Sequence, residues 1–399
     1  MRIVWLAVAD ARGHLMRAHL VRRLLARYGA RVDVITTSEE GRAFLQALGT
    51  PSEVLSSHFG VAYDVRQNMV RPRTEACILR YLFTPSRGAA DLARLSDFAR
   101  GASYVVNDFH PLLLVSGSRP AGGGHAFPCP VVHVYGENIW RAIEGHFEGR
   151  GPALAHKGFG ALVRALRDRA HARIEHTLAA PLSGERDPLR RTHRLLPIVA
   201  PPRRSAAEVR AARGLLPGAR LAAVYLNPHF ADPAVAEAIE ESLLAEGYAM
   251  HAVGEGYAHR PAWRAYDPDF GSVAAAADLL VSAPGMGAVG MARLFGVPLL
   301  ALLTDQPEQR QNTQNFASCP EGTFAGVELV APGHLDGRLR EAIRALGPEP
   351  GSALARPSAV HLVSRVHESW ARILLDIATP APSRRTQPVS KTHHHEVHP

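Results

Sequence analysis

The stretch SAPGMGAVGMARLFGVP, residues Ser282–Pro298, contains the pattern that decides the fold class of this chain. It overlaps one apolar run, ADLLVSA, and leads into another, VPLLALL. The apolar residues between these runs have helical spacing, so the order is strand, glycine turn, helix and strand, the repeating unit of a parallel sheet. A glycine turn before a helix aims backbone N–H groups at phosphate, although it can equally serve to pack the helix on the sheet. Ala283 and Met291 stand where polar side chains would assist phosphate binding.

The same alternation of strands and helices runs through both halves of the chain. The expected strands are residues 2–8, 31–37, 102–109, 129–136, 219–226, 248–254, 277–283 and 297–303. The expected helices are residues 14–29, 39–49 and 232–247, a short helix that opens at Ser272, the helix after the glycine turn, and residues 357–378. Strands that alternate with helices indicate doubly wound parallel sheets, so the fold class is α/β.

An Arg- and Pro-rich stretch, residues 184–208, interrupts the pattern and is interpreted as a linker. The expected domains are therefore residues 1–200 and residues 205–355, two α/β units of similar build. Residues 356–378 are expected to fold back as a helix on the first domain. From residue 379 to residue 399 the chain is rich in Pro, Ser and His, which indicates a disordered tail.

Composition limits the class of protein. The 399 residues are 46% apolar, enough for buried cores, and no apolar run reaches the roughly 18 residues of a membrane span. The first residues lack the features of a signal peptide, so the expected location is cytoplasmic. The three cysteines are widely spaced and odd in number, which argues against a disulfide framework and a zinc site.

The net charge of the chain limits the classes of partner that it favours. The net charge of +8 comes almost entirely from arginine, and we interpret it as the amino-acid bias of a GC-rich genome. A basic surface still favours phosphate-bearing substrates, or at most peripheral contact with an anionic membrane. Nucleic acid is disfavoured as a partner, because the sequence has no basic helix with interleaved aromatic residues.

Ligands of open α/β sheets bind beyond the carboxyl ends of the strands, so the loops there are the places to look for a site. The loop ADARGH brings His14 to the start of a helix, where it is either a general base or a histidine without a chemical role. The loop VVNDFHP has Asp108 directly after a strand, where a lone aspartate more often forms a turn. Both loops emerge at one edge of the same sheet, and a carboxylate that orients a histidine makes imidazole a competent base. The pair is therefore the stronger candidate.

The second half offers two further loops. The glycine turn contributes Gly285, Met286 and Gly287, although a lone GxG is weak evidence. The loop TDQPEQRQNTQN follows the strand VPLLALL and concentrates amide and carboxylate side chains that suit hydrogen bonding to sugar hydroxyls. Its candidates are Asp305, Gln306, Glu308, Gln309 and Asn312.

In this order the loops resemble those of a known family. GH at an N-terminal helix, VVNDF, a late SxxGMG turn and GVPLLALLTDQPEQ are similar to motifs of nucleotide-sugar glycosyltransferases of the two-Rossmann GT-B fold, families 28 and 1, in a prokaryotic branch. The similarity covers residues 1–375, and the conjunction of motifs is more specific than any one motif. It implies two Rossmann-like domains facing a cleft, the first binding a hydroxyl acceptor and the second a UDP- or dTDP-linked sugar.

The resemblance also implies roles for residues. His14 would deprotonate the acceptor hydroxyl with the support of Asp108, and attack from the face opposite the leaving group would invert the anomeric carbon. No metal or resident cofactor would be needed, because the helix dipole and amide groups carry the leaving charge. The implied donor contacts are Gly285, Met286 and Gly287 for the phosphates, and Asp305 and Gln306, with Glu308 and Gln309 beside them, for the sugar.

Three positions depart from the family's pattern. Ala283 replaces a histidine that contacts phosphate, Met291 replaces an acidic residue that binds ribose, and Pro284 stands where the family has a small residue. His229, at the end of the second domain's first strand, is a candidate for the lost phosphate contact on its loop placement alone. These losses predict a weak or altered donor site, at which thymidine and uridine donors compete closely.

Two other classes of function stay open: a GT-B protein that binds a ligand or partner without turnover, and another GT-B enzyme such as a sugar-nucleotide epimerase or hydrolase. The presence of both His14 and Asp108 favours a catalyst. A natural product and a lipid are equally compatible as acceptors. Residues 58–87 are expected to form part of the acceptor wall, although core packing explains their aromatic side chains equally well. These are Phe59, Tyr63, Met69, Tyr81 and Phe83.

Overall fold

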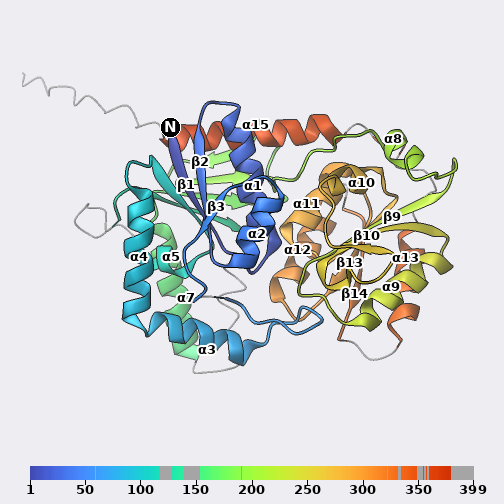
Figure 1. Cartoon of the computed structure of the whole chain (residues 1–399), viewed down its shortest axis with the longest axis horizontal. Coiled ribbons are helices and arrows are strands. Elements are labelled where there is room, and N and C mark those ends of the chain that lie inside the picture. Colours follow the sequence, from blue (N-terminus) through green and yellow to red (C-terminus); the bar gives the residue numbers. More distant parts are fainter. Residues whose placement is uncertain are drawn as a thin grey trace, which may run out of the picture.

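A computed structural model describes residues 1–58, 60–116, 127–138, 153–189, 191–320, 322–330, 334–347, 354, 356 and 359–378. Within these residues the chain forms an eight-stranded sheet and a six-stranded sheet, and helices pack against both (Figure 1). The expected fold class, two doubly wound α/β halves, is confirmed. Phe59 and the tail from residue 379 lie outside the described residues.

The first sheet has the strand order β3-β2-β1-β4-β5-β6-β8-β7. Its strands are β1 (Arg2–Ala7), β2 (Arg31–Thr36), β3 (Ser52–Val54), β4 (Tyr104–Asp108), β5 (Val131–Gly136), β6 (Ala172–His176), β7 (Glu185–Asp187) and β8 (Thr192–Leu195). The described strands pair in parallel, except that β7 is antiparallel to β8. Residues 184–208 were expected to be a linker, and this is wrong for the first part of that stretch, because β7 and β8 extend the sheet through it.

The helices of the first half are α1 (Arg12–Ala26), α2 (Glu39–Ala47), α3 (Arg71–Leu82), α4 (Pro85–Ala99), α5 (Pro111–Ser116) and α7 (Ala153–Asp168). After α1 the chain reverses through Gly29, whose φ of 69° is the left-handed conformation that glycine adopts most readily. At the start of α2 the Ser38 side chain accepts a hydrogen bond from the Gly41 N–H, a typical N-cap.

The second sheet has the order β11-β10-β9-β12-β13-β14. Its strands are β9 (Arg220–Leu226), β10 (Tyr248–Gly254), β11 (Trp263–Arg264), β12 (Leu279–Ser282), β13 (Leu299–Leu303) and β14 (Phe324–Glu328). Its helices are α8 (Ala206–Ala211), α9 (Pro233–Ala245), the short η1 (Glu255–Tyr257), α10 (Phe270–Ala276), α11 (Met286–Phe295), α12 (Pro307–Ala317) and α13 (Leu335–Leu346).

One helix start differs from the expectation. The short helix α10 begins at Phe270, with Asp269 as its N-cap residue, and not at Ser272. Ser272 lies inside the helix, where its hydroxyl accepts hydrogen bonds from the N–H groups of Arg203 and Arg204 at 2.8 and 3.2 Å. A residue that the sequence pattern assigned to a helix end thus holds the connection between the two sheets.

One hydrophobic cluster extends through both domains. A single cluster of buried side chains continues from Trp5 in the first sheet through Ile198 and Val199 to Val289 on α11 and Trp370 on α15 (Ala359–Ala378). In Figure 1 the red helix α15 runs along the edge of the first domain, and Trp370 Nε1 donates to the Leu196 carbonyl at 2.8 Å. This packing brings the carboxyl ends of the central strands of both sheets to one cleft.

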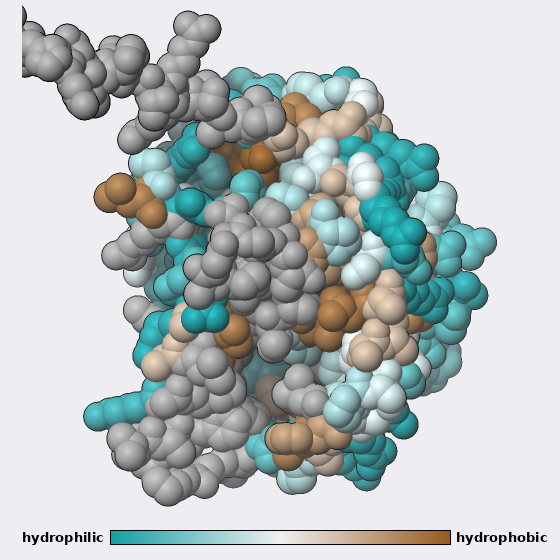
Figure 2. Space-filling view, turned by 90° about the vertical axis from the view of Figure 1, so that its left-hand side faces the viewer, coloured by the Kyte–Doolittle hydropathy of each residue, from teal (hydrophilic) through white to brown (hydrophobic). Residues whose placement is uncertain are grey.

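The outer face of the first domain is mixed in character. Figure 2 shows hydrophobic side chains scattered among hydrophilic ones over that face, and hydrophilic ones predominate along its right-hand margin. Over the described part of the chain, no helix is both long and apolar enough to cross a membrane.

Candidate functional site

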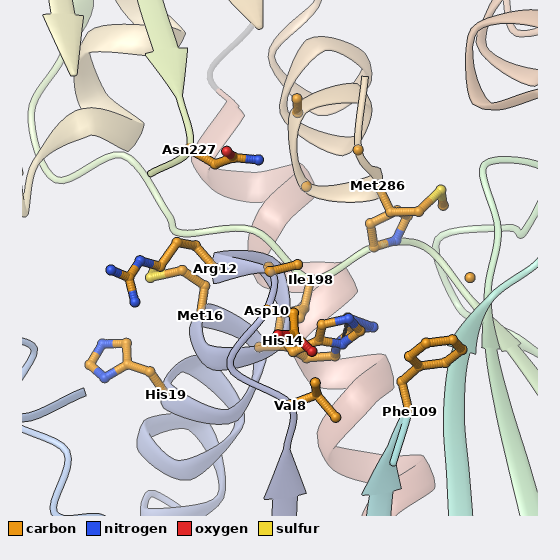
Figure 3. A pocket seen from close by; sticks show the side chains of 18 of the residues that line it. Val8, Asp10, Arg12, His14, Met16, His19, Phe109, Ile198, Asn227 and Met286 are labelled. Atoms are coloured by element: carbon orange, nitrogen blue, oxygen red, sulfur yellow. Dashed lines mark hydrogen bonds between the residues drawn. The ribbon is translucent and has the colours of Figure 1, made fainter. Parts of the chain in front are cut away.

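A cavity of about 1690 Å³ lies between the two domains. Its walls come from the loop after β1, the start of α1, the ends of β4, β5 and β6, and α3 on one side. On the other side they come from the end of β9, the start of α11 and the start of α12. In Figure 3, Asp10, His14 and Phe109 from the first domain lie below Met286 and Asn227 from the second. The cleft expected between two Rossmann-like domains is therefore present.

The structure brings His14 and Asp108 together. β1 and β4 are parallel neighbours in which Ala7 lies opposite Asp108, so the loop after β1 and the end of β4 emerge at the same place. His14, in the first turn of α1, has its Nδ1 atom 2.6 Å from Asp108 Oδ1. The His14 side chain is 22% exposed, whereas that of Asp108 is fully buried. Asp108 thus fixes the imidazole through Nδ1, while part of the ring stays accessible from the cavity.

Asp108 has two further partners that help to define the state of His14. Trp5 Nε1 donates to Asp108 Oδ2 at 3.2 Å, and Arg17 Nε lies 3.1 Å from the same oxygen. A buried carboxylate so surrounded acts as an acceptor, so we assign the His14 proton to Nδ1. Nε2 then carries the free lone pair, as a general base requires.

Phe109 follows Asp108 and shapes the same wall. Its φ of 79° is unusual for a residue with a side chain, and strained residues of this kind concentrate at functional sites. Its ring is stacked on that of His14, with centroids 6.0 Å apart and planes 9° from parallel. Behind it, Asn107 Oδ1 accepts the His110 N–H at 2.8 Å, which braces the loop.

His176 was not among the residues predicted from the sequence. It ends β6, lines the cavity, and has its Nε2 atom in contact with the Arg17 guanidinium that also faces Asp108. Burial, and then the charge of Arg17, lowers its pKa well below the ordinary value, so His176 is neutral. No motif surrounds it, and the strand that carries it was not recognised, so the sequence offered no signal for this residue.

Asp10 is a second residue that was missed, although the ADARGH loop contains it. It lines the cavity, and its Oδ2 atom is buried without a hydrogen-bond partner in the described structure. Burial raises the pKa of Asp10 to about 6, while a backbone hydrogen bond from Val61 and the nearby His14 oppose the rise. The available signal was the position of Asp10, directly after a strand that leads into the cleft.

The glycine turn opens onto the cavity from the second domain. Gly285 is the N-cap residue of α11, and Gly285, Met286 and Gly287 all line the cavity, as do Ala283 and Met291. The Gly285 N–H donates to the Ala283 carbonyl at 2.8 Å, and the first bond of the helix runs from the Val289 N–H to the Gly285 carbonyl at 3.1 Å. The N–H groups of Met286, Gly287 and Ala288 in the first turn are therefore the ones that the helix itself does not use. These groups, with the positive end of the helix dipole, suit a diphosphate.

The sequence left two roles open for the glycines of this stretch, phosphate binding and helix packing, and the structure assigns them to different glycines. A Cβ added at Gly285 or Gly287 meets no described atom within 4 Å, so packing does not require either glycine. A Cβ at Gly290, by contrast, would lie 2.9 Å from the Pro197 Cβ, which shows that this glycine lets α11 pack on the connection between the domains. The open space lies where a ligand would approach the helix end.

The loop after β13 is divided between the cavity and the first domain. Gln306, Glu308 and Gln309 line the cavity. Asp305 is not among the lining residues, and its Oδ1 atom accepts the Met69 N–H at 3.0 Å. Burial raises the pKa of Glu308, and the nearby His14 opposes that rise.

Amide side chains brace this wall. Gln309 Oε1 accepts the Thr304 N–H at 2.9 Å. Asn312 Nδ2 donates to the Pro284 carbonyl at 2.9 Å and so supports the glycine turn from behind. The amides that the sequence singled out thus include residues that support the cavity wall as well as residues that face it.

His229 does not line the cavity. Its Nε2 atom lies 2.7 Å from the Asp10 carbonyl oxygen, and its ring is 4.2 Å from that of Tyr63, centroid to centroid. The structure therefore places His229 between the two domains, where it contacts the turn that precedes His14. Asn227, from the same loop, does line the cavity.

The expected acceptor wall is partly at the cavity. Tyr63 and Met69 line it, together with α3 residues that the sequence did not single out, Arg71, Thr74, Ile78 and Leu79. Tyr81 is buried and donates its hydroxyl to Asp91 Oδ2 at 2.8 Å, so it has a core role. Phe83 is 78% exposed. Among the described residues, no group of three or more His, Cys, Asp and Glu side chains is arranged to hold a metal ion.

Comparisons with known proteins bear on the fold. No protein-family model matches the chain, and no curated protein matches it significantly. Among solved structures it is similar to the calicheamicin glycosyltransferase CalG4, at 18% identity and a TM-score of 0.52, over 95% of this chain and 96% of that one. It is similar to the spinosyn rhamnosyltransferase SpnG complexed with thymidine diphosphate, at 16% identity and a TM-score of 0.54, over 94% and 100% of the two chains.

A third similar structure is that of UGT89C1 from Arabidopsis thaliana complexed with quercetin, at 12% identity and a TM-score of 0.56, over 95% of this chain and 99% of that one. At such identities a likeness establishes the fold and leaves the chemistry to be argued from the site. Because each likeness covers nearly the whole of both chains, the protein has the two-domain GT-B fold that these structures share.

Proposed function

We propose that the protein is a glycosyltransferase that moves a sugar from a nucleoside-diphosphate donor to a hydroxyl group of a small natural product or a lipid. The observation that carries the proposal is the position of the His14–Asp108 pair and the open helix end at Gly285–Gly287 in the walls of one cavity. A base and a diphosphate site are the two elements that such a transfer requires.

The chemistry follows from these two elements. His14 Nε2 takes the proton of the acceptor hydroxyl, and the acceptor oxygen forms a bond to the anomeric carbon of the sugar. The bond from that carbon to the diphosphate oxygen breaks, and the diphosphate leaves with the electron pair. Attack from the face opposite the leaving group inverts the anomeric carbon. N–H groups at the start of α11 stabilise the departing charge, so the reaction needs no metal or further cofactor.

The compared structures support the classes of ligand. SpnG was solved with thymidine diphosphate and UGT89C1 with quercetin. A dTDP- or UDP-linked sugar is therefore the proposed donor. The acceptor is assigned to the part of the cavity next to α3, which the apolar Ile78 and Leu79 and the polar Thr74 line.

Replacement of His14 tests the proposal. His14→Ala should lower turnover roughly 10²–10⁴-fold, the usual contribution of a general base. The readout is release of the nucleoside diphosphate from dTDP-glucose or UDP-glucose with a panel of phenolic and lipid acceptors. Calorimetry with dTDP should show unchanged binding, because His14 faces the acceptor. Asp108 is a less suitable target, because its removal would leave the buried Arg17 without its carboxylate.

Two results would contradict the proposal in different ways. Normal turnover by His14→Ala would show that another group is the base. If no nucleoside diphosphate or sugar nucleotide binds the folded wild-type protein at millimolar concentration, the transferase proposal fails. A GT-B protein that binds a different ligand or a partner in the cleft then becomes the better explanation.

A further inference from the structure

A short hairpin, residues 62–70, reaches from the first domain to the second. Its two arms are joined by the pairing of Tyr63 with Met69 and by hydrogen bonds from the Asp64 N–H to the Asn68 carbonyl and from the Val70 N–H to the Ala62 carbonyl. In Figure 1 the blue segment that leads into α3 extends toward the second domain. Its tip is held by the opposite domain.

Two loops of the second domain hold the hairpin. In the loop before α9, the N–H groups of Ala231 and Asp232 donate to the Val65 carbonyl at 2.8 and 3.0 Å. Arg66 Nε donates to Asp232 Oδ2 at 2.5 Å, and the Asp232 side chain is only 15% exposed. A partly buried ion pair with two backbone hydrogen bonds beside it is a defined contact, not a chance approach of two surfaces.

The second anchor occupies the loop that the resemblance assigns to the donor sugar. Asp305 accepts the Met69 N–H at 3.0 Å, and the Asp305 N–H donates to Asn68 Oδ1 at 3.1 Å. Gln306 Nε2 donates to the Gln67 carbonyl at 2.9 Å. The Asp305 carboxylate and the Gln306 amide nitrogen are therefore engaged by the hairpin, and the subsite gains a wall from the first domain.

Gln67, at the tip of the hairpin, has the properties of a ligand-binding residue. It is 8% exposed and lines the cavity, yet its Oε1 atom is buried with no hydrogen-bond partner in the part of the chain that is described. Its φ of 64° is a conformation that residues with side chains rarely adopt. A buried acceptor without a partner is costly, so such an atom in a cavity calls for a donor from a ligand.

The chemistry of the Gln67 Oε1 atom limits which group of a ligand it can bind. An amide oxygen only accepts hydrogen bonds, and a diphosphate at neutral pH has no hydrogen to offer, so the partner must be an O–H or N–H group. The surroundings are acidic: burial, followed by the carboxylates of Glu308, Asp10 and Asp305, raises the pKa of Tyr63 in the same hairpin. Gln67 thus belongs to a polar subsite between the His14 turn and the start of α12.

We propose that Gln67 is a specificity-determining residue whose Oε1 atom accepts a hydrogen bond from a hydroxyl group of the transferred sugar. The first domain then contacts the donor sugar through the hairpin. The amide oxygen of Gln67 adds a hydrogen bond to those that the loop after β13 supplies. This inference rests on the proposed function, since it names a contact within the same donor site.

The test compares a nucleotide with its sugar derivative in the absence of any acceptor. Calorimetry is performed on wild type, Gln67→Ala and Gln314→Ala, with dTDP and dTDP-glucose and with UDP and UDP-glucose. For the pair that binds, Gln67→Ala should raise the Kd of the sugar nucleotide about tenfold and leave the Kd of the nucleoside diphosphate within about twofold. Gln314, exposed on α12, is the matched control and should change neither.

Thermal unfolding separates recognition from a structural role. Because the Gln67 side-chain oxygen has no partner in the described structure, Gln67→Ala should keep or raise the unfolding temperature. Gln67→Gly should raise it further, because glycine adopts a φ of 64° without strain. A lower unfolding temperature with equal loss of both ligands would show that Gln67 only supports the hairpin, and would overturn the proposal.

The remaining outcomes are also decisive. If the ratio of the two Kd values is the same in wild type and in Gln67→Ala, Gln67 does not contact the sugar, while the transferase proposal stands. If wild type binds neither nucleoside diphosphate, the proposed function itself fails, and the assignment of Gln67 fails with it.

Discussion

At the scale of single residues, Asp10 and Asp108 have contrasting surroundings, although they follow or end neighbouring strands of one sheet. Asp108 has Trp5, Arg17 and His14 around it, all of which favour a carboxylate acceptor. Asp10 has a buried Oδ2 without a partner in the described structure, and burial raises its pKa to about 6. Burial therefore favours the protonated form of Asp10 in the folded protein.

The raised pKa of Asp10 predicts a pH-dependent effect of Asp10→Asn. Between the ordinary value of 3.8 and about 6, the unfolded chain has lost this proton and the folded chain has kept it. The carboxyl group therefore makes the folded state less stable as pH rises through that window. Asp10→Asn should be more stable than wild type at pH 7, by at most about 3 kcal/mol, and equal to it below pH 4.

Urea unfolding of both proteins at pH 3.5, 5 and 7 measures this difference. The variant should show its advantage only in the two higher samples, with the larger value at pH 7. An Asp10→Asn protein that is less stable than wild type at pH 7 would mean that the carboxylate has a stabilising partner, contrary to the burial argument.

At the scale of elements, the glycines at the start of α11 and inside it have different roles. Gly290 allows close packing against the first domain, whereas Gly285 and Gly287 border open space. Gly290 meets Pro197 and Val199, whereas a Cβ at Gly287 would extend into the cavity. A glycine inside a helix costs about 1 kcal/mol relative to alanine, so an open helix end is maintained at some expense in stability. That pattern is expected where a ligand approaches the backbone.

Gly287→Val should therefore raise the Kd for dTDP or UDP by at least about tenfold without lowering the unfolding temperature. The added side chain occupies the space in front of the helix N–H groups and touches no described protein atom at its Cβ. Calorimetry and thermal unfolding provide the two readouts.

Gly290→Ala is the matched control on the same helix. It should lower the unfolding temperature, because its Cβ would lie 2.9 Å from that of Pro197, and it should leave the Kd per folded molecule unchanged. Nucleotide binding by Gly287→Val at wild-type strength would show that the diphosphate does not sit at this helix end.

At the scale of the whole molecule, the first domain carries several buried histidines whose pKa values burial lowers. Burial lowers the pKa of His110 to about 3, and it lowers those of His19, His133 and His193 to about 4. His176 is lowered as well. These residues lie on α1, after β4, and on β5, β8 and β6, so they are distributed over the first sheet and its cover.

This distribution predicts that acid destabilises the protein through its first domain. A histidine in the unfolded chain takes up a proton near pH 6.5, while its folded counterpart stays neutral down to about pH 4. Each such residue therefore removes up to about 1.4 kcal/mol of stability per pH unit as pH falls through that window. The unfolding temperature should fall steeply between pH 6.5 and pH 4.5.

Amide hydrogen exchange at pH 7 and pH 5 locates the effect. Protection should fall first in β4, β5 and β6 and only afterwards in the second sheet. A flat unfolding temperature across this range, or earlier loss of protection in β9 and β12, would contradict the prediction, and the buried histidines would then have partners that stabilise their charged forms.

Much of the architecture is encoded locally. The run YAMHAVG is β10 from its first residue to its last, and Asp232 caps α9 with its side chain, because apolar periodicity and N-cap chemistry act within a few residues. The approach of His14 to Asp108 was also predictable. Both residues follow parallel strands, and the carboxyl ends of adjacent parallel strands meet at one edge.

Other features of the site depend on contacts across the cleft. Asp305 accepts a hydrogen bond from Met69, and His229 contacts the Asp10 carbonyl, although each has neighbours in sequence that face the cavity. Gln306 lines the cavity and also donates to the Gln67 carbonyl. No local pattern distinguishes Asp305 from Glu308, because both are acidic residues of one loop. Their different partners are selected by where the hairpin of the first domain docks.

The sequence by itself thus determined four strands of each sheet, together with the helices α1, α2, α9, α11 and α15. These strands are β1, β2, β4 and β5 in the first sheet and β9, β10, β12 and β13 in the second. Hydrophobic burial and backbone hydrogen bonding are satisfied within each α/β unit, so a short stretch carries the information. Only the tertiary structure decided which polar groups remain without partners, as Gln67 Oε1 and Asp10 Oδ2 do in the described structure. That outcome depends on how the two domains pack against each other. A donor that forms a hydrogen bond across the cleft is no longer available to a nearby acceptor.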